Sequence, residues 1–146
     1  MESARNGVLA CPEGTELVLI HDGARPLVSA ELIHRAAEAA RTWGAAVPAL
    51  PVTDTVKLAE DGFVRATPDR EKLFAAQTPQ AFQMDLIRAA LEDAVAQGLP
   101  LTDDSAAVER LGMRVRLIEG EQTNLKITYP GDLLRAETII EERERV

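Results

Sequence analysis

Short apolar runs alternate with longer stretches of helical spacing along most of the chain, and this alternation restricts the fold more than any other feature. Residues 16–20 are apolar almost throughout and stop abruptly at residues 21–23, as a strand buried within a sheet does. Ser29 can cap the helix that follows, and Gly44 lies just beyond its end. Strands that alternate with helices build a parallel sheet covered by helices. We therefore expect an α/β fold with a mostly parallel sheet and helices on both faces.

The middle of the chain departs from this alternation. Two runs with strand character, residues 54–58 and 63–67, flank Asp61-Gly62, which favours a tight hairpin turn because glycine accepts a positive φ. No helix separates the two runs, so we expect a β-hairpin arm, from about residue 52 to residue 78, that projects from the sheet. The other expected elements are a strand at 45–52, helices at 84–97, at 102–112 and from Pro130, and strands at 114–118 and 124–127.

The size and charge of the chain restrict its partners. Its 146 residues suit a single domain, 1–146. The 16 lysine and arginine residues against 24 aspartate and glutamate residues give a net charge of −8, which repels the backbone of a nucleic acid. The single cysteine cannot form an internal disulfide, which fits a reducing, cytoplasmic compartment. No apolar run approaches the ~20 residues that cross a bilayer, so we expect a soluble protein that binds neither nucleic acid nor membrane.

Two charged residues follow the first expected strand. Asp22 lies at the carboxyl end of that strand, where ligands bind in open α/β sheets. A carboxylate there can hold Mg²⁺, which takes a few protein oxygens together with substrate phosphates. Arg25, on the same short loop, can neutralise phosphate oxygens. The pair predicts a site for a magnesium-bound polyphosphate; the alternative is a turn aspartate that pairs locally with Arg25.

Polar residues further along the chain suggest two more anion sites. Strand alternation puts Lys126 on the same side as Asn124 and Thr128, which suits a phosphate or a phosphorylated polyol. The alternative for Lys126 is an exposed lysine that discourages pairing at a sheet edge. A hairpin brings its ends together, so Thr55 and Arg70 can form a second anion site at the base of the arm. The alternative is that both are ordinary polar hairpin residues.

Six short motifs follow one another along the chain. They are residues 21–26 (His-Asp-Gly-Ala-Arg-Pro), 51–57 (Pro-Val-Thr-Asp-Thr-Val-Lys), 69–70 (Asp-Arg), 77–82 (Gln-Thr-Pro-Gln-Ala-Phe), 102–104 (Thr-Asp-Asp) and 124–128 (Asn-Leu-Lys-Ile-Thr). Their order and composition resemble the 2-C-methyl-D-erythritol 4-phosphate cytidylyltransferase family of the non-mevalonate isoprenoid pathway. The resemblance implies a Rossmann-like fold. It also implies that the family's N-terminal strand, glycine-rich loop and Pro-Lys-Gln segment are missing, so that the chain corresponds to roughly the last two-thirds of the enzyme.

The same resemblance implies a reaction and its site. The family transfers CMP from CTP to 2-C-methyl-D-erythritol 4-phosphate, releases pyrophosphate and uses Mg²⁺. The implied site residues are Asp22 for the metal, Asp22, Arg25 and Lys126 for catalysis, Ser3, Asp22 and Lys126 for the nucleotide, and Thr55, Arg70, Thr102 and Thr128 for the substrate.

The resemblance further implies a homodimer joined through the arm at 52–78, in which Thr55 and Arg70 complete the phosphate site of the partner. Without the glycine-rich loop and its lysine, which grip the triphosphate, we expect little turnover from these 146 residues alone. Three alternatives stay open: a ribitol 5-phosphate cytidylyltransferase, a receiver-like phosphoacceptor domain with a strand-end aspartate, and a non-catalytic remnant that dimerises through its arm.

Overall fold

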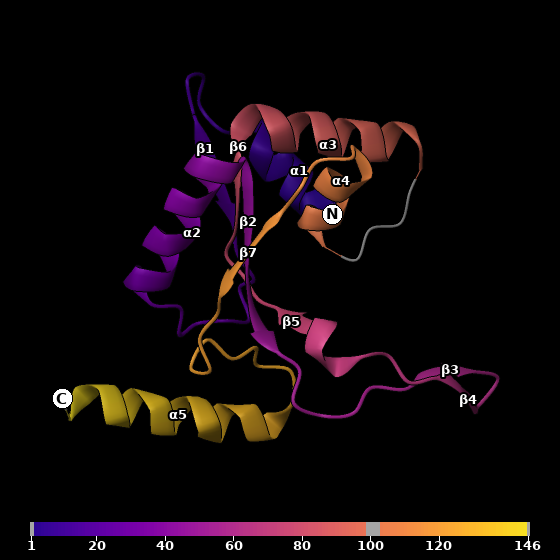
Figure 1. The fold of residues 1–146 in the computed structure, drawn as a ribbon. Coiled ribbons are helices and arrows are strands. Elements are labelled where there is room, and N and C mark those ends of the chain that lie inside the picture. Colours follow the sequence, from indigo (N-terminus) through magenta and orange to yellow (C-terminus); the bar gives the residue numbers. More distant parts are fainter. Residues whose placement is uncertain (1, 99–102, 146) are drawn as a thin grey trace.

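The computed structural model describes residues 2–98 and 103–145. A five-stranded sheet lies between helices (Figure 1). Helix α2 (Ala30–Trp43) covers one face, whereas α1 (Glu2–Leu9), α3 (Met84–Ala96) and α4 (Asp104–Arg110) lie on the other. The predicted α/β class, with helices on both faces of the sheet, is confirmed.

The sheet is mixed rather than built from parallel neighbours alone. Strands β1 (Leu17–Ile20), β2 (Ala45–Pro51) and β7 (Arg116–Glu119) share one direction, because β7 pairs in parallel with β2 and β6 lies antiparallel between β1 and β2. Strands β6 (Gln80–Gln83) and β5 (Phe74–Ala76) follow one another along β2, both antiparallel to it. Sequence patterning did not foresee β5 and β6, because both are short and β6 begins and ends with glutamine.

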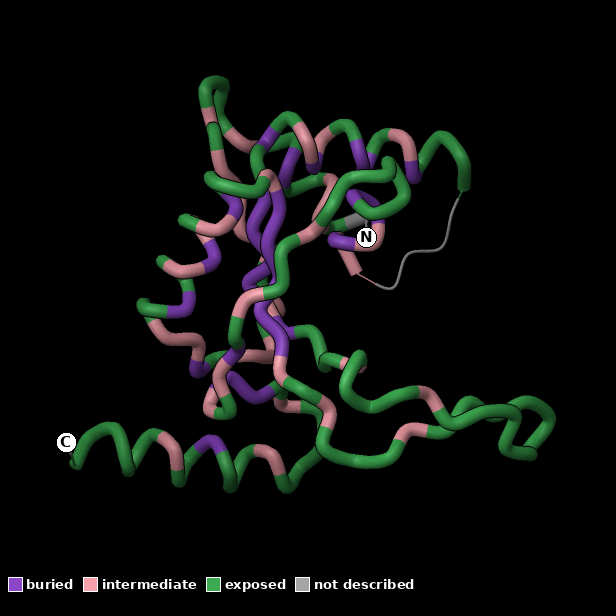
Figure 2. The backbone as a smooth tube through the Cα atoms, in the orientation of Figure 1, coloured by how far each residue is buried: buried purple, intermediate pink, exposed green. Residues whose placement is uncertain are grey.

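Side chains alternate across the sheet and divide the core in two. On the face towards α3, Phe82 and its cross-strand neighbour Ala45 are fully buried. On the opposite face, Ala46 and Ala81 pack against Ala36 of α2, and these small residues let the helix approach the sheet closely. Figure 2 shows the buried residues concentrated along the central strands. The core therefore fixes the ends of the strands, where the cavity described below opens.

Both predicted ends of α2 are confirmed. The Ser29 hydroxyl accepts a hydrogen bond from the Leu32 N–H at 2.9 Å, as an N-cap does. Gly44 has a φ of 89° and donates its N–H to the Ala40 carbonyl at 2.8 Å. A positive φ at this place favours glycine because it has no Cβ.

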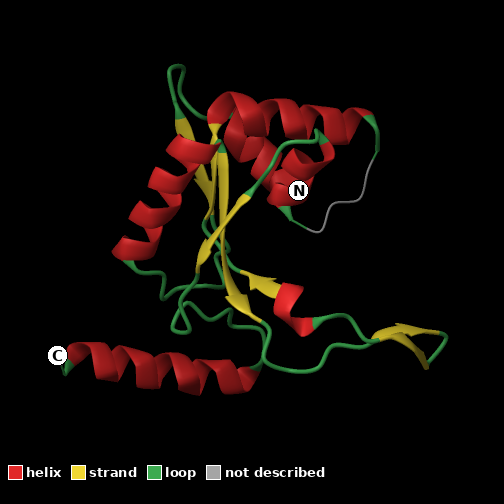
Figure 3. Cartoon of the chain, viewed as in Figure 1, coloured by secondary structure: helices red, strands yellow, loops and turns green. Residues whose placement is uncertain are grey.

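The arm leaves the sheet as predicted (Figure 3). Strands β3 (Leu58–Glu60) and β4 (Phe63–Ala66) form an antiparallel hairpin, and Asp61 and Gly62 turn with φ values of 51° and 82°. Strand β4 agrees with the run expected at 63–67, but β3 begins where the run expected at 54–58 ends, and the pairing shifts register between Leu58 and Ala59. A short 3₁₀ helix, η1 (Arg70–Lys72), precedes β5, which already belongs to the main sheet.

Two predicted elements are wrong in detail. Residues 124–127 form no strand; instead the Asn124 side chain is buried, and the Ile127 N–H donates to the Ala24 carbonyl at 2.8 Å. Helix α4 is capped by Asp103, whose carboxylate accepts from the Ala106 N–H at 3.0 Å. Aspartate caps helices at least as well as threonine, so the pattern alone could not choose. Thr102, the predicted cap, lies outside the described residues.

The chain ends in α5 (Pro130–Glu144), which begins at the predicted proline. Its Ala136 and Ile139 pack with Leu27 and Leu125, away from the two main core clusters. Within the described residues, no helix has both the length and the apolar content that a membrane span requires.

Candidate active site

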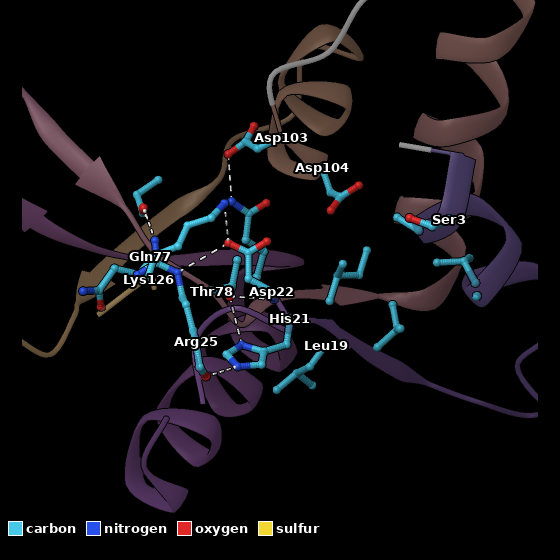
Figure 4. Close-up of a pocket in the computed structure, with 17 residues that line it drawn as sticks. Ser3, Leu19, His21, Asp22, Arg25, Gln77, Thr78, Asp103, Asp104 and Lys126 are labelled. Carbon is cyan, nitrogen blue, oxygen red and sulfur yellow. Dashed lines mark hydrogen bonds and ion pairs between the residues drawn. The ribbon is translucent and has the colours of Figure 1, made fainter. Parts of the chain in front are cut away.

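A cavity of about 910 Å³ opens where β1 ends (Figure 4). Its wall comes from β1, the loop after β1, the link between β5 and β6, the start of α4, and α1. Asp22, Arg25 and Lys126 all line this cavity, and Ser3 of α1 lies at another part of its wall. The fold thus brings together four of the predicted site residues from three separate parts of the sequence. Their chemical roles stay predictions.

The Asp22 carboxylate lies between two cations. Its Oδ2 is 3.5 Å from Arg25 Nε and 3.2 Å from Lys126 Nζ. The Lys126 side chain is 50% exposed, so water screens this ion pair and the pair holds the lysine only weakly. Lys126 can therefore turn towards a bound anion. Two positive charges against one negative charge make this side of the cavity suitable for a polyanion.

The Arg25 guanidinium is fixed by more than its pair with Asp22. Its Nη1 donates to the Asn124 carbonyl at 2.7 Å, and Nη2 lies 3.5 Å from the Ala76 carbonyl. Only 12% of the Arg25 side chain is exposed. The local ion pair expected as the alternative does exist, but its 3.5 Å separation is longer than the bond to Asn124. Arg25 is therefore oriented mainly by backbone carbonyls from distant segments.

Sequence reasoning missed two residues that hold the loop after β1. Thr78 Oγ1 lies 3.0 Å from the Asp22 N–H nitrogen and 2.9 Å from His21 Nδ1. His21 Nε2 in turn lies 2.9 Å from the Arg25 carbonyl oxygen. Both residues belong to motifs quoted above, yet nothing in the sequence shows that positions 57 residues apart meet.

A buried polar network lies behind the cations of the cavity, beside Lys126 (Figure 4). Gln77 exchanges two hydrogen bonds with the backbone of Glu121, at 3.0 Å to the N–H and 2.9 Å to the carbonyl. The Asn124 Nδ2 donates to the Thr78 carbonyl at 2.7 Å. A Cβ at Gly120 would lie 2.5 Å from Gln77 Oε1, so this network requires a glycine there. The network ties the segment that carries Lys126 to the link between β5 and β6.

The start of α4 gives the cavity an acidic side. Asp103 is occupied as the helix cap and also accepts from Gln80 Nε2 at 2.7 Å. Asp104 faces the cavity, and burial raises the pKa of its carboxyl, with a further rise from the carboxylates of Asp103 and Asp22. The two sides of the cavity therefore differ in charge, with cations at Arg25 and Lys126 and carboxylates at α4 (Figure 4).

The residues present suit a shared magnesium site rather than a closed protein cage. Among residues 2–98 and 103–145, no group of three or more His, Cys, Asp or Glu side chains is placed to hold a metal. Mg²⁺ needs no such group, since it commonly takes one or two carboxylates and completes its shell with phosphate oxygens and water. Asp22, whose side chain is 37% exposed, fits that mode.

Three other predicted site residues that the structure describes, Thr55, Arg70 and Thr128, do not line this cavity. Thr128 is exposed, and its hydroxyl lies 3.5 Å from the Lys126 carbonyl. Thr55 and Arg70 are exposed in the arm, where Arg70 Nη1 donates to the Thr53 carbonyl at 2.8 Å. That bond joins the two ends of the arm, as the hairpin predicted. Thr102 lies outside the described residues.

Comparisons with known proteins agree with one another. The family described as 2-C-methyl-D-erythritol 4-phosphate cytidylyltransferase matches residues 1–142. Proteins of that name from Trichormus variabilis and Desulforamulus reducens are 47% identical over 144 residues and 52% identical over 142 residues. These alignments cover 98% and 97% of this chain, but only 63% and 61% of the relatives. The chain thus spans less than two-thirds of their length.

Solved structures show the same likeness. The crystal structure of 2-C-methyl-D-erythritol 4-phosphate cytidylyltransferase from Thermus thermophilus superposes with a TM-score of 0.86 at 43% identity, over 95% of this chain and 68% of that chain. The structure of 4-diphosphocytidyl-2C-methyl-D-erythritol synthase from Anaerococcus prevotii gives a TM-score of 0.87 at 37% identity, over 95% and 63%.

Proposed function

Because this chain belongs to the 2-C-methyl-D-erythritol 4-phosphate cytidylyltransferase family, we propose that it supplies most of the active site of such an enzyme. The enzyme moves CMP from CTP to 2-C-methyl-D-erythritol 4-phosphate and releases pyrophosphate. The observation that carries this proposal is the meeting of Asp22, Arg25 and Lys126 at one side of a cavity of about 910 Å³. A polyphosphate and a phosphorylated polyol both need cations of this kind.

The reaction is a displacement at phosphorus. An oxygen of the polyol phosphate forms a bond to the α-phosphorus of CTP, and the bond between that phosphorus and pyrophosphate breaks. The reacting groups are all anionic, so the protein must align them and offset their charge. Arg25 is already oriented for this task by the Asn124 carbonyl, and the half-exposed Lys126 can follow the ligand.

We assign Asp22 to Mg²⁺, which when bound would neutralise charge on the triphosphate. In this proposal Lys126 contacts the nucleotide phosphates, Asp22 would bind the nucleotide through the Mg²⁺ that it holds, and Ser3, on α1, contacts the nucleotide as well. Thr102 and Thr128 contact the polyol substrate in this proposal. Thr128 is two residues from Lys126, and its hydroxyl lies 3.5 Å from the Lys126 carbonyl oxygen.

A homodimer completes the proposal. The arm exposes large apolar side chains, namely 79% of Phe63, 63% of Val64 and 52% of Leu58. Apolar side chains gathered on a projecting segment suit a protein interface. A second copy that covers this arm would place Thr55 and Arg70 beside the cavity of its partner. We further propose a cytoplasmic location, since CTP is the substrate and Cys11 is a free thiol.

The proposal is tested by turnover of CTP with each of two acceptors. The chain alone, and the chain joined to the N-terminal region of the Trichormus variabilis relative, are incubated with Mg²⁺, CTP and either 2-C-methyl-D-erythritol 4-phosphate or ribitol 5-phosphate. We expect pyrophosphate release with the first acceptor from the joined chain and little from the chain alone. Equal activity of the two chains would contradict the expected dependence on the N-terminal region. Preference for ribitol 5-phosphate would replace the proposed substrate.

A further inference from the structure

Four residues around the cavity form a closed ring of hydrogen bonds. The Thr78 hydroxyl meets His21 Nδ1 at 2.9 Å, and His21 Nε2 meets the Arg25 carbonyl at 2.9 Å. Arg25 Nη1 donates to the Asn124 carbonyl at 2.7 Å, and Asn124 Nδ2 returns to the Thr78 carbonyl at 2.7 Å. The ring joins the loop after β1 to Thr78, in the link between β5 and β6, and to Asn124; Figure 4 labels His21, Arg25 and Thr78 at the wall of the cavity.

The partners in the ring determine which atoms carry hydrogen. The Arg25 carbonyl can only accept, so His21 Nε2 must be the donor. In a neutral imidazole Nδ1 is then an acceptor, and the Thr78 hydroxyl must donate to it. The Asp22 backbone N–H can only donate, and it donates to the same hydroxyl oxygen at 3.0 Å. Every donor and acceptor at this junction thus has one consistent role.

The ring of hydrogen bonds can hold the backbone of the loop between Asp22 and Arg25 in place. His21 and Thr78 hold the backbone of the loop at both ends, at the Asp22 N–H and at the Arg25 carbonyl. The Arg25 N–H also donates to the Asp22 carbonyl at 3.0 Å, so the loop is a tight turn. A carboxylate and a guanidinium on such a turn keep their directions only while the turn is held. Side chains that fix a ligand-binding group in this way raise the affinity of the site.

We propose that His21 and Thr78 are positioning residues that hold the Asp22–Arg25 turn in its cavity-facing orientation, with His21 as the Nε2–H tautomer. Neither side chain need touch the reacting atoms. For its binding consequences the inference rests on the proposed function, but the hydrogen-bond ring is defined without any ligand.

The first experiment uses nuclear magnetic resonance on the isotopically labelled chain without ligand. The chain has only two histidines, and exposed His34 on α2 is an internal reference. At a pH where both rings are neutral, we expect His21 to be wholly the Nε2–H tautomer, and we expect the Nδ1 resonance to shift in Thr78→Val, because that nitrogen loses the hydroxyl that donates to it. The same variant should speed hydrogen exchange of the Asp22 amide about fivefold or more, because its acceptor is gone.

Two control variants distinguish the loss of the Thr78 hydroxyl from a general disturbance of the fold. Thr78→Ser keeps the hydroxyl and should retain the wild-type signals. Thr42→Val removes a hydroxyl of the same kind, one that donates to the Glu38 carbonyl within α2, and should leave His21 and Asp22 unchanged. Unchanged His21 signals and Asp22 exchange in Thr78→Val would overturn the proposal, as would equal changes in Thr42→Val.

The second experiment measures Mg²⁺–CTP affinity by calorimetry, and turnover in the chain joined to the N-terminal region of a relative. We expect Thr78→Val to lower affinity or kcat about tenfold or more, and Thr78→Ser to restore it. Wild-type binding and turnover in a Thr78→Val chain with altered His21 signals would overturn the positioning role. If the wild-type chain binds no Mg²⁺–CTP, the proposed function fails, and the resonance data still decide whether the ring holds the turn.

Discussion

The residues around the cavity (21–25, 76–80, 103–104 and 120–126), called the rim from here on, and the arm are stabilised in different ways. At the rim, hydrogen bonds join distant segments, as from Arg25 to the Asn124 carbonyl and from Gln77 to Glu121. In the arm, the hydrogen bonds are local, as from Lys57 to Thr67 at 2.9 Å. None of residues 53–73 is buried, and Figure 2 shows the arm almost entirely exposed.

The difference shows which part of the site a single chain can organise. Burial and a long-range hydrogen bond fix the Arg25 guanidinium before any ligand arrives, which is what a charged site needs to offset charge without rearranging. The arm has no comparable support, so its large apolar side chains gain stability only against another surface. We infer that the rim acts within its own chain and the arm acts on a second one.

The largest expected effect is at the rim. In the chain joined to the N-terminal region of a relative, Arg25→Ala should lower kcat/KM about 100-fold or more, since it removes an oriented cation from a reaction between anions. Arg135→Ala, which removes an arginine whose side chain is 70% exposed on α5, is the matched control and should change turnover little. Steady-state kinetics with CTP and 2-C-methyl-D-erythritol 4-phosphate provide the measurement. Similar losses of kcat/KM in both variants would contradict a special role for Arg25 at the rim.

Mixing variants then tests whether the arm acts across the proposed dimer. Arg70→Ala should also be poorly active if Arg70 serves the cavity of the partner. A mixture of Arg25→Ala and Arg70→Ala chains contains heterodimers with one intact rim faced by one intact arm, so turnover should recover to roughly a quarter of the wild-type value. An Arg70 that served its own cavity would give no recovery in the mixture.

Gly120→Ala should lower the stability of the fold at the rim. The added Cβ would meet Gln77 Oε1 at 2.5 Å and the Ala49 carbonyl carbon at 3.2 Å, and the backbone atom cannot move aside cheaply. We expect the free energy of unfolding to fall by about 1–3 kcal/mol, measured by chemical denaturation. Gly62→Ala, at the exposed turn of the arm with a φ of 82°, should instead disturb the hairpin and leave global unfolding nearly unchanged. An equal global loss in both variants would mean that the arm is part of the cooperative core.

The contrast between rim and arm also explains what the sequence could and could not predict. Local signals were sufficient where the structure is local: Ser29 and Gly44 marked the ends of α2, and Asp61-Gly62 marked the turn of the arm. Asp22 and Arg25 were found because a strand end is a place for ligands in α/β sheets. That Lys126 approaches them was predicted from the family resemblance, since the strand expected around it does not form.

The ring through His21 and Thr78 could not be predicted from the pattern. Three of its four bonds join residues 46 to 99 positions apart, and a histidine or threonine in a loop is compatible with many environments. The strand β6 was missed for a related reason, since its glutamines carry hydrogen bonds across the fold, as Gln80 does to Asp103. Where polar side chains bridge distant segments, local propensity carries little information.

A smaller effect is expected when the apolar surface of the arm is reduced. Phe63→Ser removes the most exposed large apolar side chain of the arm, and at an interface it should weaken self-association about tenfold. Sedimentation equilibrium measures the change, and circular dichroism checks that the fold is kept. Leu134→Ser, which removes a side chain 68% exposed on α5, is the matched control. A stronger effect of Leu134→Ser would move the interface from the arm to α5.

The smallest expected effect concerns the acidic side of the rim. Burial raises the pKa of Asp104 in the folded chain, so the folded state binds its proton more tightly than the unfolded state, and ionised Asp104 lowers stability above that raised pKa. Asp104→Asn should therefore increase the free energy of unfolding at pH 7, and the gain should vanish as the pH falls below 3.8, the ordinary pKa of an aspartate carboxyl.

Asp132 should show the opposite effect on stability, because hydrogen bonds from the Tyr129 and Thr128 N–H groups lower the pKa of its carboxyl. Asp132→Asn should lose stability at pH 7, and that loss should disappear as the pH falls through the folded pKa. Denaturation curves of both variants between about pH 3 and pH 7 measure the two changes in the free energy of unfolding. Changes of the same sign would show that the surroundings of Asp104 do not disfavour its ionised form.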